Sequence, residues 1–158
     1  HFPDSLKYQT KKLARTVYGG GGIMPDFFVP IDTTQYTDYH RNIVAKGVVI
    51  KTTMKFIESH RKELQSKYKK FETFNDKFEI SDEILANMQT LAEQEKIKFD
   101  EKQYRKSLPL IKTQLKALIA RDLWDMNEYF QIMNTTDSSV IQALKVLNEG
   151  AYEKVVRL

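Results

Sequence analysis

Beyond about residue 37, the apolar residues of this chain recur at the spacing of amphipathic helices. The clearest case covers residues 48–68, where Lys55 and Glu58 fall on the polar side. The predicted apolar stripe of that helix consists of Ile50, Met54, Ile57, Leu64 and Tyr68. A shorter helix is predicted over residues 38–46, and Gly47 breaks or bends the chain between the two.

The next segments carry loop and capping signals. Residues 69–80 are charged and aromatic around Asn75-Asp76, which predicts a loop. Asp82 is placed to cap a helix that ends near Glu95, with an apolar stripe of Ile84, Leu85, Met88 and Leu91.

A capping-box pattern opens the next helix, because Asp100 is followed three residues later by Gln103. We expect this helix to be short and to end near Ser107. Pro109 then interrupts the pattern or lies in the first turn of a following helix, whose apolar face extends to Met133.

The last predicted helix lies near the end of the chain. Residues 134–137 break the apolar pattern, and Asp137 is placed to cap a helix carrying Val140, Ile141, Leu144 and Leu147. Gly150 ends this helix.

The first 36 residues differ from the rest. Residues 6–18 contain several residues that favour strands, and Phe27-Phe28-Val29 predicts a second short strand before Pro30. The four glycines at 19–22 are interpreted as a tight connection between strands. The predicted fold is mainly α, with a bundle-like domain of about five to six helices over residues 37–158. A short β and glycine-rich segment, residues 1–36, precedes it as the end of another domain.

Composition narrows the chemistry. The chain has 158 residues, of which 41% are hydrophobic, enough for one ordinary core. Since cysteine is absent, disulfides, thiolate metal sites and a cysteine nucleophile are excluded. The apolar runs are too short to predict a membrane span.

The net charge of +4 raises the question of an acidic partner. One basic cluster contains Lys67, Lys69 and Lys70, and a second extends from Lys96 to Lys106. Aromatic residues interleave with both, as in a nucleic-acid surface. Glutamates are mixed into the same segments and no nucleic-acid motif accompanies them, so the favoured interpretation is a solvated surface of mixed charge. The second cluster consists of Lys96, Lys98, Lys102, Arg105 and Lys106.

Histidines and carboxylates do not predict a site. His40 and His60 lack a second ligand at zinc-motif spacing, and His60 is assigned a structural place on its helix. The pair Asp122 and Asp125 lies about one turn apart, and the favoured interpretation is a helix surface or helix end. The pair Glu93 and Glu95 gives no clearer signal. No metal and no cofactor is predicted.

The tetraglycine shares one feature with phosphate-binding loops, because the exposed N–H groups of a glycine loop can bind an anion. A phosphate loop requires Gly-Lys-Ser/Thr at the start of a helix, but here Ile23-Met24-Pro25 follows. The dinucleotide pattern fails for the same reason. A connection between strands is therefore favoured.

A resemblance to a known family is carried by these N-terminal residues. Tyr8-Gln9-Thr10 is followed by LARTVYGGGGIMPD at 13–26. This sequence resembles the closing segment of the protease domain in carboxy-terminal processing peptidases, the tail-specific serine proteases of the S41 family. Arg15, Ile23, Pro25 and Asp26 match the family pattern, whereas Ala14 stands where the family usually has glycine. Asp32-Thr33-Thr34 and the helical stretch 111–121 resemble a bacterial envelope branch with a helical C-terminal extension.

The resemblance implies a parent enzyme that cleaves polypeptides near their C-termini with a serine nucleophile and a lysine base. In the family both residues lie upstream of the glycine-rich segment, and neither Ser59 nor Ser107 stands in the nucleophile motif. The chain alone is therefore expected to be inactive. Its implied partners are the upstream protease and PDZ-like domains, polypeptide substrates and, as one role of the helices, a homo-oligomer. The implied location is the periplasm or cell envelope. The alternative is a free-standing helical adaptor that binds protein or nucleic acid through basic helices.

Overall fold

The computed structural model describes residues 4–12, 14–19, 25 and 27–151, and these form a mainly α protein. The chain falls into two compact units. One is the helical unit Asp32–Asp137, and the other combines His1–Ile31 with Ser138–Leu158.

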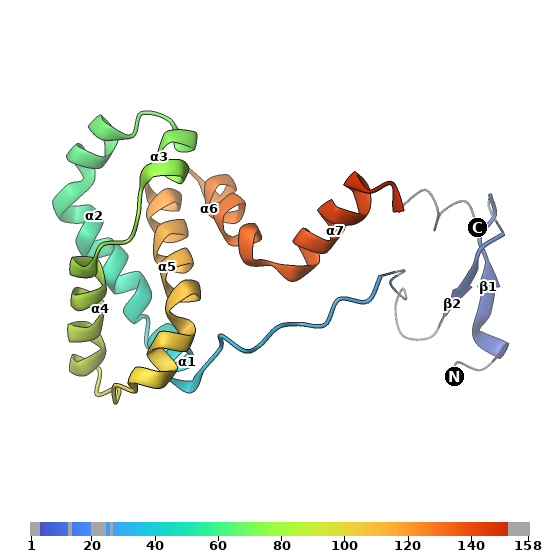
Figure 1. Ribbon diagram of the computed structural model, residues 1–158, viewed down its shortest axis with the longest axis horizontal. Helices are drawn as coiled ribbons and strands as arrows, with labels where there is room; N and C mark the ends of the chain where they lie inside the picture. Colours follow the sequence, from blue (N-terminus) through green and yellow to red (C-terminus); the bar gives the residue numbers. More distant parts are fainter. Residues whose placement is uncertain (1–3, 13, 20–24, 26, 152–158) are drawn as a thin grey trace. The chain divides into compact units, whose positions relative to one another are not determined.

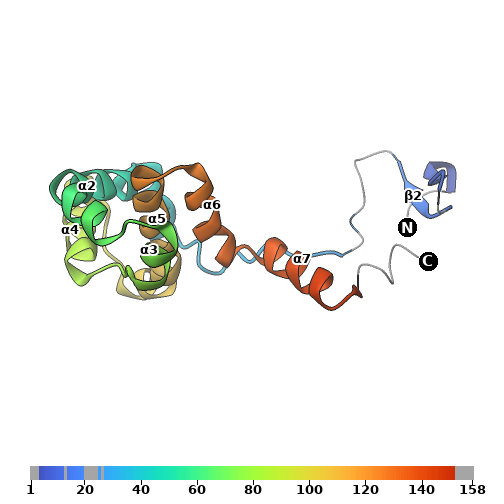
Figure 2. The same ribbon diagram turned by 90° about the horizontal axis from the view of Figure 1, so that it is seen from above.

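The helical unit is built on one long central helix. Its elements are α1 (Asp38–Ala45), α2 (Val48–Lys67), α3 (Phe71–Lys77), α4 (Asp82–Gln94), α5 (Glu101–Leu123), α6 (Met126–Met133) and the short 3₁₀ turn η2 (Asn134–Thr136). Figure 1 shows α2 between α4 and α5, with α1 at the end of the bundle where α5 begins. Helix α6 packs on α5, and Figure 2 shows the same unit from above.

Polar side chains begin most of these helices. Thr37, Asp100 and Asp125 accept hydrogen bonds from backbone N–H groups at the starts of α1, α5 and α6. The predicted cap at Asp82 is wrong by one residue, because Ser81 is the N-cap of α4 and its hydroxyl accepts from the N–H of Ile84. Gly47 separates α1 from α2 with φ of 69°, a left-handed conformation that favours glycine.

The core gathers around Phe74, which α3 places against the central helices. Its ring stacks on Phe78 with centroids 4.6 Å apart, and it contacts Trp124 at 5.3 Å and Tyr68 at 5.5 Å. The other fully enclosed apolar side chains described in the unit are Ile43, Val48, Ile84, Met88, Ile111, Leu115 and Ile119, together with Ala117 and Ala120.

The predicted stripe of α2 is correct only at its C-terminal end. Ile57, Leu64 and Tyr68 are buried, but Ile50 and Met54 are 45% and 63% exposed. The buried face at the start of α2 instead contains Val48, Val49, Thr52 and Thr53. The threonines fit there because their hydroxyls donate to the carbonyl oxygens of Val48 and Ile50, which removes the cost of burying them.

Two further expectations are corrected. The predicted loop 69–80 contains α3, a helix too short to show a periodic pattern, which is held by the burial of Phe74. Pro109 does not interrupt the helix that starts at Asp100. Helix α5 continues through it to Leu123, since Ser107, Leu110 and Ile111 on either side are buried. The chain breaks instead at Trp124 and Asp125, before α6.

The second unit contains a small hairpin. After the 3₁₀ turn η1 (Asp4–Leu6), β1 (Lys7–Gln9) pairs antiparallel with β2 (Thr16–Tyr18), with Tyr8 opposite Val17. Both strands therefore lie inside the segment predicted as one, and 27–29 is not a strand. The strands are connected by residues 10–15, so the prediction that the glycines connect them is wrong. Gly20–Gly22 lie outside the described residues.

The hairpin turn places Ala14 in the left-handed region, with φ of 48°. The N–H of Ala14 donates to the carbonyl oxygen of Thr10, and the N–H of Thr10 donates to that of Arg15. At the end of β2, a Cβ on Gly19 would lie 2.8 Å from Cε2 of Tyr8, so this glycine permits the ring to pack over it. Helix α7 (Ser138–Asn148) belongs to the same unit, and Gly150 after it has φ of 65°, as expected of a residue that ends a helix.

The corrected face of α2 leads to a first prediction. Ile57→Ala should lower the free energy of unfolding of the helical unit by about 2–5 kcal/mol, because it opens a cavity in the core. Met54→Ala, three residues away on the exposed side, should change it by no more than about 0.5 kcal/mol. Urea unfolding followed by circular dichroism measures both. Equal losses would contradict the observed orientation of α2.

The turn leads to a second prediction. Ala14→Gly should stabilise the hairpin by about 1 kcal/mol, since a left-handed conformation costs an alanine about that much more than a glycine. Hydrogen exchange of the Thr10 amide, which is bonded across the turn, should slow severalfold. Faster exchange in the variant would show that residue 14 has another conformation.

Candidate functional site

Two neighbouring cavities open on the helical unit, next to the connection between α3 and α4. The larger has a volume of about 400 Å³, within the range of ligand pockets, and the smaller about 330 Å³. Phe78 and Glu79 line both cavities. The larger cavity is lined by Asn75, Phe78, Glu79, Ile80, Lys112, Thr113, Lys116, Ile132 and Thr135.

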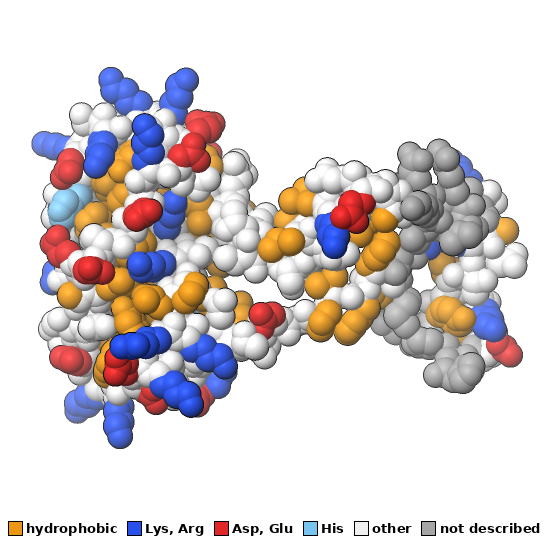
Figure 3. Space-filling model, viewed as in Figure 1, with side chains coloured by type: hydrophobic (Ala, Val, Ile, Leu, Met, Phe, Trp, Pro, Cys, Tyr) orange, Lys and Arg blue, Asp and Glu red, His pale blue; other side chains and the backbone are white. Residues whose placement is uncertain are grey.

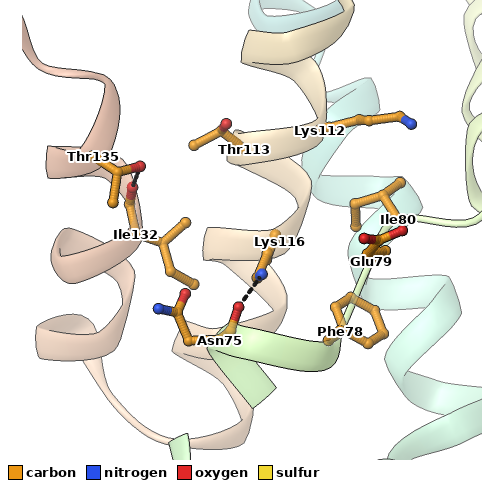
Figure 4. A pocket seen from close by; sticks show the side chains of 9 residues that line it. All are labelled: Asn75, Phe78, Glu79, Ile80, Lys112, Thr113, Lys116, Ile132 and Thr135. Atoms are coloured by element: carbon orange, nitrogen blue, oxygen red, sulfur yellow. Dashed lines mark hydrogen bonds between the residues drawn. The ribbon is translucent and has the colours of Figure 1, made fainter. Parts of the chain in front are cut away.

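These side chains come from the helices α3, α5 and α6, the turn η2 and the connection between α3 and α4 (Figure 4). Lys112 and Lys116 lie one turn apart on α5, with Thr113 turned towards α6. Ile132 and Thr135 face them from α6 and η2, while Asn75 closes the cavity from α3. We call this cavity the α5–α6 groove.

Lys116 is the best-fixed cation in the groove. Its Nζ donates to the carbonyl oxygen of Asn75 at 2.6 Å and lies 5.9 Å from the centre of the Phe74 ring. Partial burial lowers the pKa of Lys116, and the carboxylates of Glu79 and Asp76 act in the opposite direction. An ammonium carries three N–H donors, so Lys116 retains donors for a ligand beyond its bond to Asn75.

The connection between α3 and α4 forms one wall of the groove and has the pattern of a strand. Phe78 and Ile80 are buried and Glu79 between them is exposed, while Phe78 and Ser81 have extended backbones. Across the described residues, no hydrogen bond within the chain uses the N–H or the carbonyl oxygen of Glu79 or Ile80. The groove is therefore bordered by backbone groups that are left to water or to a ligand.

The smaller cavity lies against α2. The ring of His60 stacks on Phe56 with centroids 4.5 Å apart, and its Nδ1 lies 3.0 Å from the Phe56 carbonyl oxygen one turn earlier. Because a carbonyl oxygen only accepts, Nδ1 carries the hydrogen of this contact. Glu63, Lys67 and Lys77 surround the same cavity, so its rim has mixed charge.

The serines considered in the sequence have structural roles. Ser107 is fully buried, and its Oγ donates to the carbonyl oxygen of Gln35 at 2.6 Å and lies 2.7 Å from the Thr37 hydroxyl. Ser59 donates to the carbonyl oxygen of Lys55 within α2. His40 is buried as well, with Nε2 2.9 Å from Oε1 of Gln114. None of these three faces either cavity.

The carboxylates that the sequence places close together are bound by different groups in the structure. Asp122 forms an ion pair with Arg61, whereas Asp125 caps α6. Glu95 pairs with Lys51 at 2.6 Å, which lowers the pKa of Glu95 through the hydrogen bond and the charge of Lys51. Within the described ranges, no group of three or more His, Cys, Asp or Glu residues could hold a metal ion.

The two basic clusters lie at opposite ends of the helical unit. Lys67 is the last residue of α2, and Lys69 and Lys70 follow it, whereas the residues from Lys96 to Lys106 surround the start of α5. Figure 3 shows basic side chains at both ends of this face, with acidic side chains among them. The clusters therefore do not merge into one basic surface. Among the described helices, none is long and apolar enough to cross a membrane.

Comparison with known proteins gives one match. Residues 39–125 match a family of unknown function (DUF8443). The chain belongs to this family. The DUF8443 match covers more than half of the chain and extends from α1 to the cap of α6. It therefore contains the lining of the α5–α6 groove that comes from α3, the α3–α4 connection and α5. No curated protein and no solved structure matches the chain significantly.

The sequence did not identify the groove. In the sequence, Lys112 and Lys116 carry no signal beyond their place in a predicted helix, and residues 75–80 lie in a predicted loop. The alternation of Phe78, Glu79 and Ile80 was the available signal, but three residues are too few to define a strand.

Buried Tyr39 gives a pH prediction. Burial, followed by the charges of Tyr104 and Glu93, raises the pKa of Tyr39 to about 12, and within the described residues its hydroxyl has no hydrogen-bond partner. In the unfolded chain the hydroxyl of Tyr39 ionises near pH 10, whereas in the folded protein it stays neutral up to about pH 12. The stability associated with the neutral Tyr39 is therefore fully present below about pH 10 and is lost between about pH 10 and 12.

Tyr39→Phe should remove this loss of stability above pH 10 and also the cost of an unpartnered hydroxyl. We expect the free energy of unfolding at pH 7 to be unchanged or higher, and its decline above pH 10 to be shallower than in the wild type. Urea titrations at pH 7 and pH 11 measure both. The same decline in the two proteins would contradict the raised pKa.

Proposed function

We propose that the chain is the C-terminal part of an S41-family carboxy-terminal processing serine peptidase, and that its helical unit is an accessory domain without the catalytic dyad. The proposal rests on the residues of the N-terminal segment that resemble the end of the protease domain. The helical unit would pack against that domain, shape access of the polypeptide, dock a partner or mediate oligomerisation.

The backbone of Ala14 supports this proposal from an independent direction. The family pattern has glycine before the arginine, and residue 14 has φ of 48°, in the region that favours glycine. The one departure of this chain from the pattern near Arg15 is thus compatible with the family's turn. The resemblance of residues 8–26 is the observation that carries the proposal, and the backbone of Ala14 is compatible with it.

The serines support the inactive role of the isolated chain. An activated nucleophile needs a base within hydrogen-bond reach and access to the substrate. Ser107 is enclosed in the core and bonded to Gln35, and Ser59 is bonded to its own helix. Both hydroxyls are therefore engaged in folding.

The proposed partners are the upstream protease and PDZ-like domains and the polypeptide substrate, in the periplasm or cell envelope. A free-standing adaptor that binds nucleic acid is less well supported, because the basic clusters are separated and part of their charge is neutralised. Arg105, for example, pairs with Glu101 at 2.5 Å.

The experiment is to extend the coding sequence upstream and to assay the chain with and without that extension. We expect a serine and a lysine in the family motifs upstream, cleavage of an unstructured polypeptide by the extended protein, and none by residues 1–158. Replacing the upstream serine with alanine is the control for contaminating proteases. Cleavage by residues 1–158 that is lost on Ser59→Ala, or an upstream region without the dyad, would overturn the proposal.

A further inference from the structure

The α5–α6 groove combines features that together suit an extended peptide. One wall is a short extended segment in which the backbone groups of Glu79 and Ile80 form no hydrogen bond among the described residues, and the opposite wall carries two lysines whose positions on α5 are one turn apart. Peptides that bind by strand addition use backbone hydrogen bonds for affinity and nearby pockets for specificity.

The charges in the groove favour one carboxylate over several. Lys112 has no ion pair within the described residues, and Lys116 is held by the carbonyl oxygen of Asn75. Glu79, exposed on the facing wall, would repel a peptide with a run of acidic residues. A ligand with a single carboxylate brings less negative charge towards Glu79 than an acidic run does, and Lys112 and Lys116 offset that charge.

The remaining lining matches the rest of such a ligand. Ile132 and Phe78 are apolar, and Thr113 and Thr135 donate their hydroxyl hydrogens to backbone carbonyls and so present acceptor lone pairs. A volume of about 400 Å³ accommodates a short peptide end.

We propose that the α5–α6 groove binds the C-terminal end of an extended polypeptide, whose backbone pairs with residues 78–80 and whose terminal carboxylate meets Lys112 and Lys116. The choice of a chain terminus rests on the proposed function, since a peptidase that cuts near C-termini creates such ends at every cleavage.

The test uses residues 1–158 and a fluorescein-labelled hexapeptide, Gly-Ser-Val-Thr-Val-Ile, with either a free carboxyl terminus or an amide. Fluorescence anisotropy should show binding of the free acid and about tenfold weaker binding of the amide, the loss expected for one charge-assisted hydrogen bond. Equal affinity of the two peptides, or no binding of the free acid, would overturn the proposal.

Variants locate the site. Lys112→Gln should weaken the free acid about tenfold and leave the amide unchanged, while Lys69→Gln removes the same charge outside the groove and should leave both unchanged. Lys112 is exposed, so its loss should not affect folding, which circular dichroism checks. Equal effects of the two variants would show only general attraction between charges.

Backbone pairing has its own readout. Saturating free-acid peptide should shift the amide signals of Glu79 or Ile80 in the nitrogen–proton correlation spectrum and slow exchange of at least one of them. Unchanged signals there would exclude strand addition. These measurements do not depend on the upstream dyad, so failure of peptide binding and failure of the peptidase proposal are distinguishable.

Discussion

The helical unit depends on the burial of one side of α5 from Ser107 to Ala120. Alanine at 117 and 120, with Leu115 and Ile119 beside them, leaves no exposed surface at these positions, and α1, α2 and α6 all pack against this helix. Small residues allow close approach, while the large ones fill the space between helices. The same burial explains why α5 continues through Pro109, since neighbouring turns remain packed where one backbone bond is lost.

The groove is a consequence of this arrangement. The buried side of α5 fixes the position of the helix, and this in turn fixes the positions of Lys112 and Lys116 opposite the connection between α3 and α4. That connection is in turn held by Phe78 and Ile80, whose side chains are in the core. A rigid wall on each side limits the entropy that a bound peptide would have to remove from the protein.

Much of the fold could be predicted from the sequence, because helical spacing and caps are local signals. The starts of α1, α2 and α5 were predicted at the correct residue, and Asp100 caps as expected. What failed depends on tertiary packing. Ile50 and Met54 are apolar yet exposed, because Thr52 and Thr53 can satisfy their own hydroxyls in the core. The groove could not be predicted for a similar reason, because its lining comes from three segments that are far apart in the chain, 75–80, 112–116 and 132–135.

The hydrogen bonds around Ser107 have a mechanical consequence. The residues just before α1 are tied to α5, since Ser107 donates to the carbonyl oxygen of Gln35 and its Oγ lies 2.7 Å from the hydroxyl of Thr37. A pull on the chain ahead of Gln35 would therefore load the central helix before it could unwind α1. Tension applied to the residues ahead of Gln35 would in this way reach the helix that bears Lys112 and Lys116.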